Sequence, residues 1–76
     1  MKTSYFTFGW GQTHDFGGLT LDKDIVVKIT AEDPRAKMFE LFGDKWFTDY
    51  PSVEAVNMSF YPRGIYDINK GEFVDE

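Results

Sequence analysis

Hydrophobic and polar residues alternate along two segments of the chain, at the period of two that a β-strand requires. In the segment 3–8, Phe6 and Phe8 lie on one face of the predicted strand, and Tyr5 and Thr7 lie on the other. In the segment 24–30, every second residue from Ile25 onward is aliphatic. This alternation predicts two half-buried strands, separated by a long connection that contains most of the glycines.

A helical pattern follows the second strand and has a recognisable signal at each end. Asp33 can accept a hydrogen bond from the first turn, and Pro34 suits the first helical position, where an N–H has no partner. Gly43 supplies the left-handed residue that ends many helices. We therefore predict a helix over 34–42, with Arg35 laying its stem over neighbouring rings and keeping its charge in water. The predicted core face of this helix consists of Met38, Phe39, Leu41 and Phe42.

The rest of the chain contains shorter elements. Residues 45–50 are rich in aromatic side chains and read as a third strand, which ends before a proline. A short helix is predicted over 52–56, and the turn 62–64 precedes a short strand over 65–68. Residues 73–74 are predicted to make a last contact at a sheet edge.

These elements predict one small α+β domain over residues 1–76. Because the strands are joined without full crossover helices, we expect an antiparallel sheet of three to four strands with one main helix packed on one face. Residues 9–22 form a glycine-punctuated connection, and a connection of this length is often functional in a compact domain. We expect it to be an exposed loop.

The composition favours binding over catalysis. The 76 residues include eight Phe, four Tyr and two Trp, which is more aromatic surface than so small a core easily hides. There is no cysteine, so disulfides and thiolate metal sites are excluded, and the single histidine, His14, has no imidazole partner for a zinc site. We expect no metal and no cofactor.

The charge balance narrows the class of partner. Thirteen acidic residues against eight basic ones give a net charge of −5, and the basic residues are scattered. Direct nucleic-acid binding is disfavoured because it needs clustered cations, even where single strands stack on aromatic rings. An acidic surface suits docking on a basic patch of another protein. The longest aliphatic run, Ile25 to Val27, is too short to cross a membrane, and the start lacks the features of a signal peptide, so we expect a cytoplasmic protein.

Two local features need a choice between functional and structural readings. His14 beside Asp15 resembles a general base with an orienting carboxylate, although adjacent residues rarely point to one place. Trp10 stands between two glycines. It is either the last residue of the core face begun by Phe6 and Phe8, which the alternation favours, or an exposed anchor for a partner.

Two segments carry a resemblance to a known group of proteins. Residues 8–14 read Phe-Gly-x-Gly-Gln-x-His and residues 42–46 read Phe-Gly-x-Lys-Trp. With the sequence between them, they resemble a pattern in small proteins of bacteriophages and other mobile elements, over roughly residues 5–51. The function of that group is unsettled, so it supplies no catalytic residues. The resemblance implies a phage-borne protein that acts in the bacterial cytoplasm, where such accessory proteins often bind and inhibit a host factor.

The sequence therefore predicts a non-enzymatic, phage-type accessory protein that binds and modulates a host protein, such as a nucleic-acid-processing or anti-phage defence enzyme. The partner is expected to present a basic surface patch. One alternative is a self-associating structural protein that forms a homodimer, and another is a small enzyme that uses His14 and Asp15. The residues predicted to contact the partner are Trp10, Gln12, His14, Asp15, Asp44 and Asp49.

Overall fold

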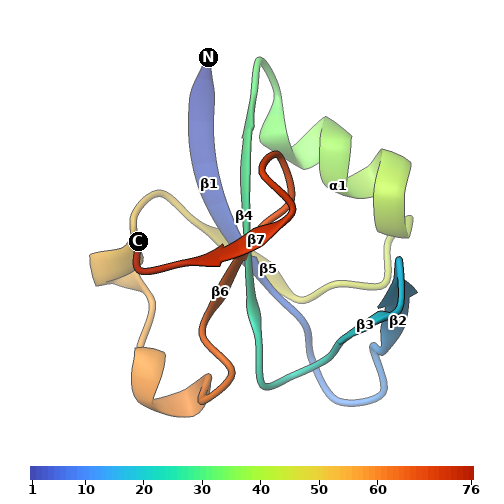
Figure 1. The fold of residues 1–76 in the computed structure, drawn as a ribbon. Helices are drawn as coiled ribbons and strands as arrows, with labels where there is room; N and C mark the ends of the chain where they lie inside the picture. Colours follow the sequence, from blue (N-terminus) through green and yellow to red (C-terminus); the bar gives the residue numbers. More distant parts are fainter.

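The computed structural model describes residues 1–76, which form a five-stranded sheet, a separate two-stranded hairpin, one α-helix and two short 3₁₀ turns (Figure 1). The elements in chain order are β1 (Lys2–Thr7), β2 (His14–Phe16), β3 (Leu19–Leu21), β4 (Val26–Ala31), α1 (Pro34–Phe42), β5 (Thr48–Tyr50), η1 (Val53–Ala55), η2 (Met58–Phe60), β6 (Ile65–Asp67) and β7 (Glu72–Val74).

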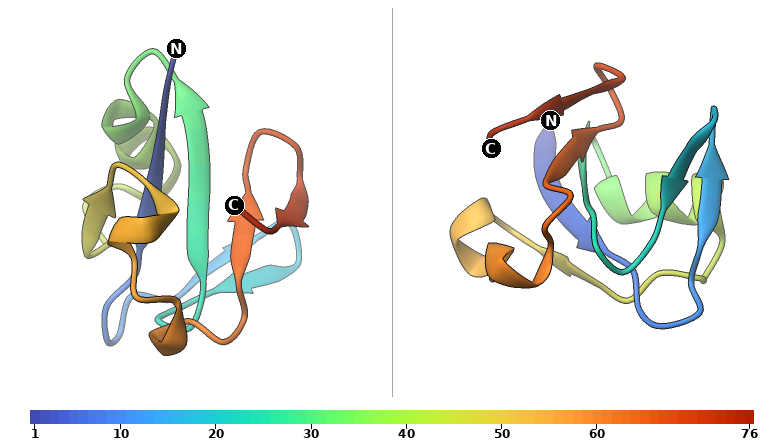
Figure 2. Two further views of the ribbon diagram at one scale, coloured as in Figure 1. Left: turned by 90° about the vertical axis from the view of Figure 1, so that its left-hand side faces the viewer. Right: turned by 60° about the horizontal axis from the view of Figure 1, so that its bottom comes forward.

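The main sheet has the strand order β5-β1-β4-β6-β7, which the left view of Figure 2 shows across its face. β1 and β4 are its long central strands and pair antiparallel, with Phe6 opposite Val27. β4 and β6 pair parallel, with Val26 opposite Ile65. The two edge strands, β5 and β7, have three residues each, so each one offers only a short run of unpaired backbone to another chain.

The predicted fold class is wrong. The structure is mostly β, with a mixed five-stranded sheet and a second sheet, instead of an α+β domain with three to four antiparallel strands. The parallel pair arises because the chain leaves β4, passes through α1, β5 and both 3₁₀ turns, and returns to β4 along β6. β6 has only three residues, and so short a strand does not reveal in the sequence which strand it pairs with.

The second sheet lies inside the segment that was expected to be an exposed loop. β2 and β3 form a hairpin with Phe16 opposite Leu19. Gly17 and Gly18 make its two-residue turn, with φ angles of 60° and 89°. Positive φ at both central residues is what a type I′ turn requires, and it matches the twist of the paired strands.

The helix prediction is confirmed in its bounds. Asp33 accepts a hydrogen bond from the Ala36 N–H at 3.2 Å, and Gly43 ends α1 with a φ of 66°. Met38 and Phe42 are buried, but Phe39 is 50% exposed, so its assignment to the core is wrong. Neither α1 nor the 3₁₀ turns have the length and hydropathy to cross a bilayer.

Both faces of the main sheet are covered, and Figure 1 shows α1 and the hairpin on one side and the 3₁₀ turns on the other. The predicted alternation holds, because Phe6 and Phe8 join the core under α1 whereas Tyr5 joins the core under the 3₁₀ turns. The strands are thus covered on both faces instead of one. The helix-side core contains Phe6, Phe8, Leu21, Ile25, Val27, Ile29, Met38, Phe42 and Trp46, and the opposite core contains Tyr5, Val26, Val56 and Ile65.

Candidate functional site

The largest hollow of the molecule is a groove of about 560 Å³ that is mainly aromatic. It is built where the loop after β1, the turn before β4, the segment before β5 and the end of η2 meet. The loop after β1, the turn before β4 and η2 lie at the lower end of the sheet in Figure 1. Five aromatic side chains line it, and we call it the aromatic groove: Phe8, Trp10, Phe47, Phe60 and Tyr61. The rest of its wall is formed by Gly9, Gln12, Lys23 and Asp24.

Three of these aromatic side chains are largely in water. Trp10 is 86% exposed, Phe60 68% and Phe47 67%. The core position favoured for Trp10 is therefore wrong. β1 ends at Thr7, so the alternation that places Phe6 and Phe8 inside does not continue to Trp10.

Gln12 holds the loop that presents Trp10. Its side-chain Oε1 accepts a hydrogen bond from the Gly9 N–H at 2.6 Å, and its backbone N–H donates to the Gly9 carbonyl at 3.1 Å. A Cβ added at Gly9 would lie 3.2 Å from that same Oε1 and 3.8 Å from Phe47 Cβ. The loop is thus closed by its own side chain, and Gly9 permits the close approach.

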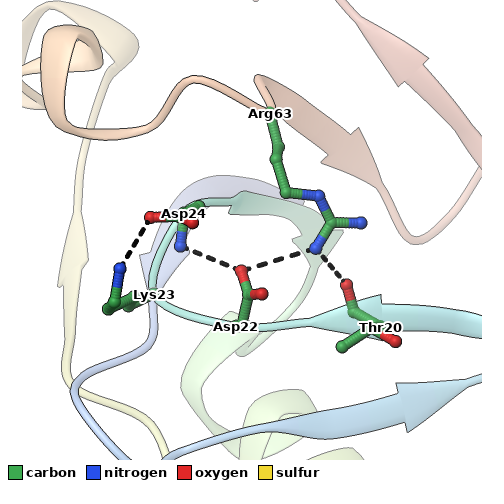
Figure 3. A network of polar contacts seen from close by, with 5 residues as sticks. All are labelled: Thr20, Asp22, Lys23, Asp24 and Arg63. Atoms are coloured by element: carbon green, nitrogen blue, oxygen red, sulfur yellow. Dashed lines mark hydrogen bonds and ion pairs between the residues drawn. The ribbon is translucent and has the colours of Figure 1, made fainter.

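One charged pair lies beside the exposed indole. The Lys23 ammonium lies 4.6 Å from the Trp10 ring centroid and 3.1 Å from Asp24 Oδ1. Figure 3 shows this pair next to the contacts that fix the turn. Asp22 accepts from the Asp24 N–H at 3.0 Å, while Arg63 donates to the Thr20 carbonyl and lies 3.4 Å from Asp22. The backbone under Lys23 and Asp24 is therefore anchored on both sides.

A smaller hollow of about 350 Å³ adjoins the aromatic groove, because Phe47 lines both. Its lining includes Asp44, one of the acids predicted to contact the partner, and Arg35, which pairs with a second, Asp49. Asp44 is exposed on its wall, and Asp49 pairs with the Arg35 guanidinium at 2.8 Å. That guanidinium lies 5.2 Å from the ring centroid of the buried Trp46, so it is the charged end of Arg35, and not its stem as predicted, that is placed over a ring.

His14 and Asp15 lie on β2 and do not line the aromatic groove. His14 Nε2 is 2.7 Å from the Lys45 carbonyl, and its ring packs 4.9 Å from Phe42 and 5.4 Å from Phe8, centroid to centroid. Asp15 is exposed, and its Oδ1 accepts from the Gly18 N–H of the hairpin turn. Successive residues of a strand face opposite ways, so the structure does not bring these two side chains together as a catalytic pair.

Two further observations concern metal binding and the pKa values of two tyrosines. No group of three or more His, Cys, Asp or Glu side chains lies close enough to hold a metal ion. Burial raises the pKa of Tyr5 and of Tyr50, with nearby Glu76 adding to the rise at Tyr5. Neither tyrosine lines the aromatic groove.

Comparison with known proteins gave no match: no protein-family model, no curated protein and no solved structure matches this chain. The groove therefore has to be interpreted from its own residues.

Sequence reasoning selected Trp10 and Gln12 from the groove and missed the other aromatic residues. Phe47 and Phe60 stand far apart in the chain, and only the fold brings them to one surface. The signal that could have pointed to them was the excess of aromatic residues in the segments 45–50 and 60–61. An excess indicates that some rings are exposed but does not identify which.

Proposed function

We propose that this protein is a non-enzymatic binding module, of the phage-accessory type, that docks on a host protein in the bacterial cytoplasm through the aromatic groove and modulates it. The observation that carries the proposal is the convergence of Trp10, Phe47 and Phe60, each more than 60% exposed, on one groove. Single exposed apolar side chains are normal, whereas a group of them with a polar rim marks an interaction site.

The energetic case rests on the area these rings can still bury. A Trp or Phe side chain buries about 150–250 Å² when it is covered, at about 25 cal/mol per Å². Tryptophan is also among the residues that most often dominate binding energy at interfaces. The loop carrying Trp10 is already ordered by Gln12, so less conformational entropy is lost on docking.

The charge of the chain supports a basic partner. A net charge of −5 attracts a positive surface over several ångströms and raises the association rate at low salt. Asp44 is exposed in the hollow next to the groove and takes part in no ion pair. Enzymes that process nucleic acids present basic surfaces to phosphates. We therefore propose an enzyme of this class, defence nucleases included, as the host protein.

The test is capture from a bacterial lysate with immobilised protein, followed by binding of the purified partner. Trp10→Ala and Phe60→Ala should each lose a protein that the native chain retains, without losing their fold. Phe73→Ala is the matched control, because Phe73 is 50% exposed and lies outside the groove. Equal capture by all four proteins would contradict the proposal.

Self-association through the same groove is the alternative that the exposed rings also support. Sedimentation at micromolar concentration separates the two uses. The proposal predicts a monomer whose mass does not change with concentration. A dimer that Trp10→Ala dissociates would instead identify the partner as a second copy of this chain.

A further inference from the structure

The molecule contains two stacks of the same composition, each with a tryptophan, a cation over its ring and an aspartate paired with the cation. In the first, which we call the closed stack, Arg35 lies 5.2 Å from the Trp46 centroid and 2.8 Å from Asp49. In the second, the open stack, Lys23 lies 4.6 Å from the Trp10 centroid and 3.1 Å from Asp24. The closed stack, whose cation is a guanidinium, indicates the kind of cation that the open stack can bind.

The two stacks differ in the cation and in the exposure of the tryptophan, which is 8% for Trp46 and 86% for Trp10. A guanidinium is planar, stacks on an aromatic face and can give a carboxylate two parallel hydrogen bonds, whereas an ammonium is a compact and strongly hydrated charge. Lys23 is also the chain neighbour of Asp24, and Lys23 and Asp24 are 41% and 38% exposed in their side chains. An exposed pair of this kind contributes little free energy and is easily exchanged.

The backbone of Asp24, whose carboxylate is the acceptor of the open stack, is fixed by contacts that do not involve Lys23. The Asp24 N–H donates to Asp22 (Figure 3). The Asp24 carbonyl accepts from the Arg63 N–H at 3.1 Å, so the backbone is held independently of Lys23. Lys23 is the only side chain that forms a hydrogen bond or ion pair with the Asp24 carboxylate. Trp10 remains 86% exposed even with Lys23 beside it.

We propose that the aromatic groove recognises an arginine side chain of the partner protein, which displaces Lys23, stacks on Trp10 and pairs with Asp24. This rests on the proposed function, since it specifies what the groove binds. Phe47 and Phe60 then cover the apolar residues that flank the arginine. Lys23 acts as an internal competitor that occupies the site until the arginine arrives.

The competitor role predicts a larger gain in affinity at Lys23 than the removal of a positive charge elsewhere on the surface would give. Replacing Lys23 with alanine frees both Trp10 and Asp24, so arginine should bind about two- to thirtyfold more tightly, because it no longer has to displace one exposed cation–π contact and one exposed ion pair. Asp24→Asn should weaken binding by a similar factor or more. Trp10→Ala should abolish it.

The probe is a capped peptide, acetyl-Leu-Arg-Leu-amide, titrated against the whole chain while the two indole N–H signals are followed by NMR. Its partner probe replaces arginine with citrulline, which keeps the shape and removes the charge. The Trp10 signal should move in a saturable way with arginine and about tenfold less readily with citrulline. The Trp46 signal serves as internal reference, because that indole donates to the Gly43 carbonyl inside the closed stack.

Two variants control for charge alone. Lys37→Ala removes a positive charge on the outer side of α1, where Lys37 pairs with Glu40, and should leave peptide affinity unchanged. Glu72→Gln removes a negative charge on the edge strand β7 and should do the same.

Equal affinity for the arginine and citrulline peptides, or weaker binding by Lys23→Ala, would overturn the inference. If that happens while Trp10→Ala and Phe60→Ala still lose the captured host protein, the proposed function stands and only the arginine specificity fails. If the arginine peptide binds as expected but host capture does not depend on the groove, the proposed function fails instead.

Discussion

Each of the two tryptophans has a cation near its ring and an aspartate paired with that cation, but one tryptophan is buried and the other is exposed. Trp46 is 8% exposed, with its ring edge-on to Phe6 and Phe39 and its indole N–H bonded to the Gly43 carbonyl. Trp10 is 86% exposed between two glycines. The closed stack therefore contributes to folding, whereas the open stack leaves a ring in water that folding does not need. Similar groups therefore serve stability in one stack and are available for binding in the other, although the two hollows that contain them adjoin at Phe47.

The largest expected effect comes from opening the closed stack. Trp46→Ala removes a ring that packs on Phe6 and Phe39, and such a loss costs about 3–5 kcal/mol in a core. A core in a domain of this size rarely supplies more than that in total, so the variant should be largely unfolded. Urea titration followed by circular dichroism measures it. A cooperative transition at the native midpoint would show that Trp46 is not part of the core.

A substitution of His14 tests how the β2–β3 hairpin is docked on the rest of the molecule. His14→Ala loses the contact with the Lys45 carbonyl and the packing on Phe8 and Phe42, and should lower the free energy of unfolding by about 1–2 kcal/mol. The neighbouring exposed Thr13, changed to alanine, is the control and should stay within about 0.5 kcal/mol. Equal melting of both variants would mean that the hairpin is not docked through His14.

The smallest expected difference is between the coupling energies of the two ion pairs. A double-mutant cycle of Arg35→Ala with Asp49→Ala should give a coupling of about 0.2–1 kcal/mol, because both side chains are partly exposed. The same cycle on Lys23 and Asp24 should give a smaller value, since no buried ring holds the lysine. Added salt should reduce both. A larger coupling in the open stack would contradict the view that Lys23 is easily displaced.

The sequence predicted local structure well where local chemistry decides it. The Asp33 cap, Pro34 and Gly43 gave the bounds of α1, and alternation gave the face of each residue in β1. The hairpin was missed because its two strands have three residues each and its Gly17-Gly18 turn reads as a loop. The parallel pairing of β4 with β6 depends on contacts between distant segments that no local pattern encodes.

The site was predicted only in part, for the same reason. The glycines around Trp10 and the polar Gln12 indicated a functional loop, and both residues do line the groove. Phe39 was assigned to the core because it lies in the apolar arc of the predicted helix, but its ring packs 5.4 Å from that of Trp46, centroid to centroid, and remains half exposed. Phe47 and Phe60 became part of the site through tertiary structure alone.

The most direct test of the account is to measure stability and binding together in Trp10→Ala. Because the ring is already in water, the free energy of unfolding should stay within about 0.5 kcal/mol of the native chain. Capture of the host protein and binding of the arginine peptide should both be lost. A variant that unfolds, or one that folds and binds like the native chain, would contradict the claim that Trp10 is held in water for a partner.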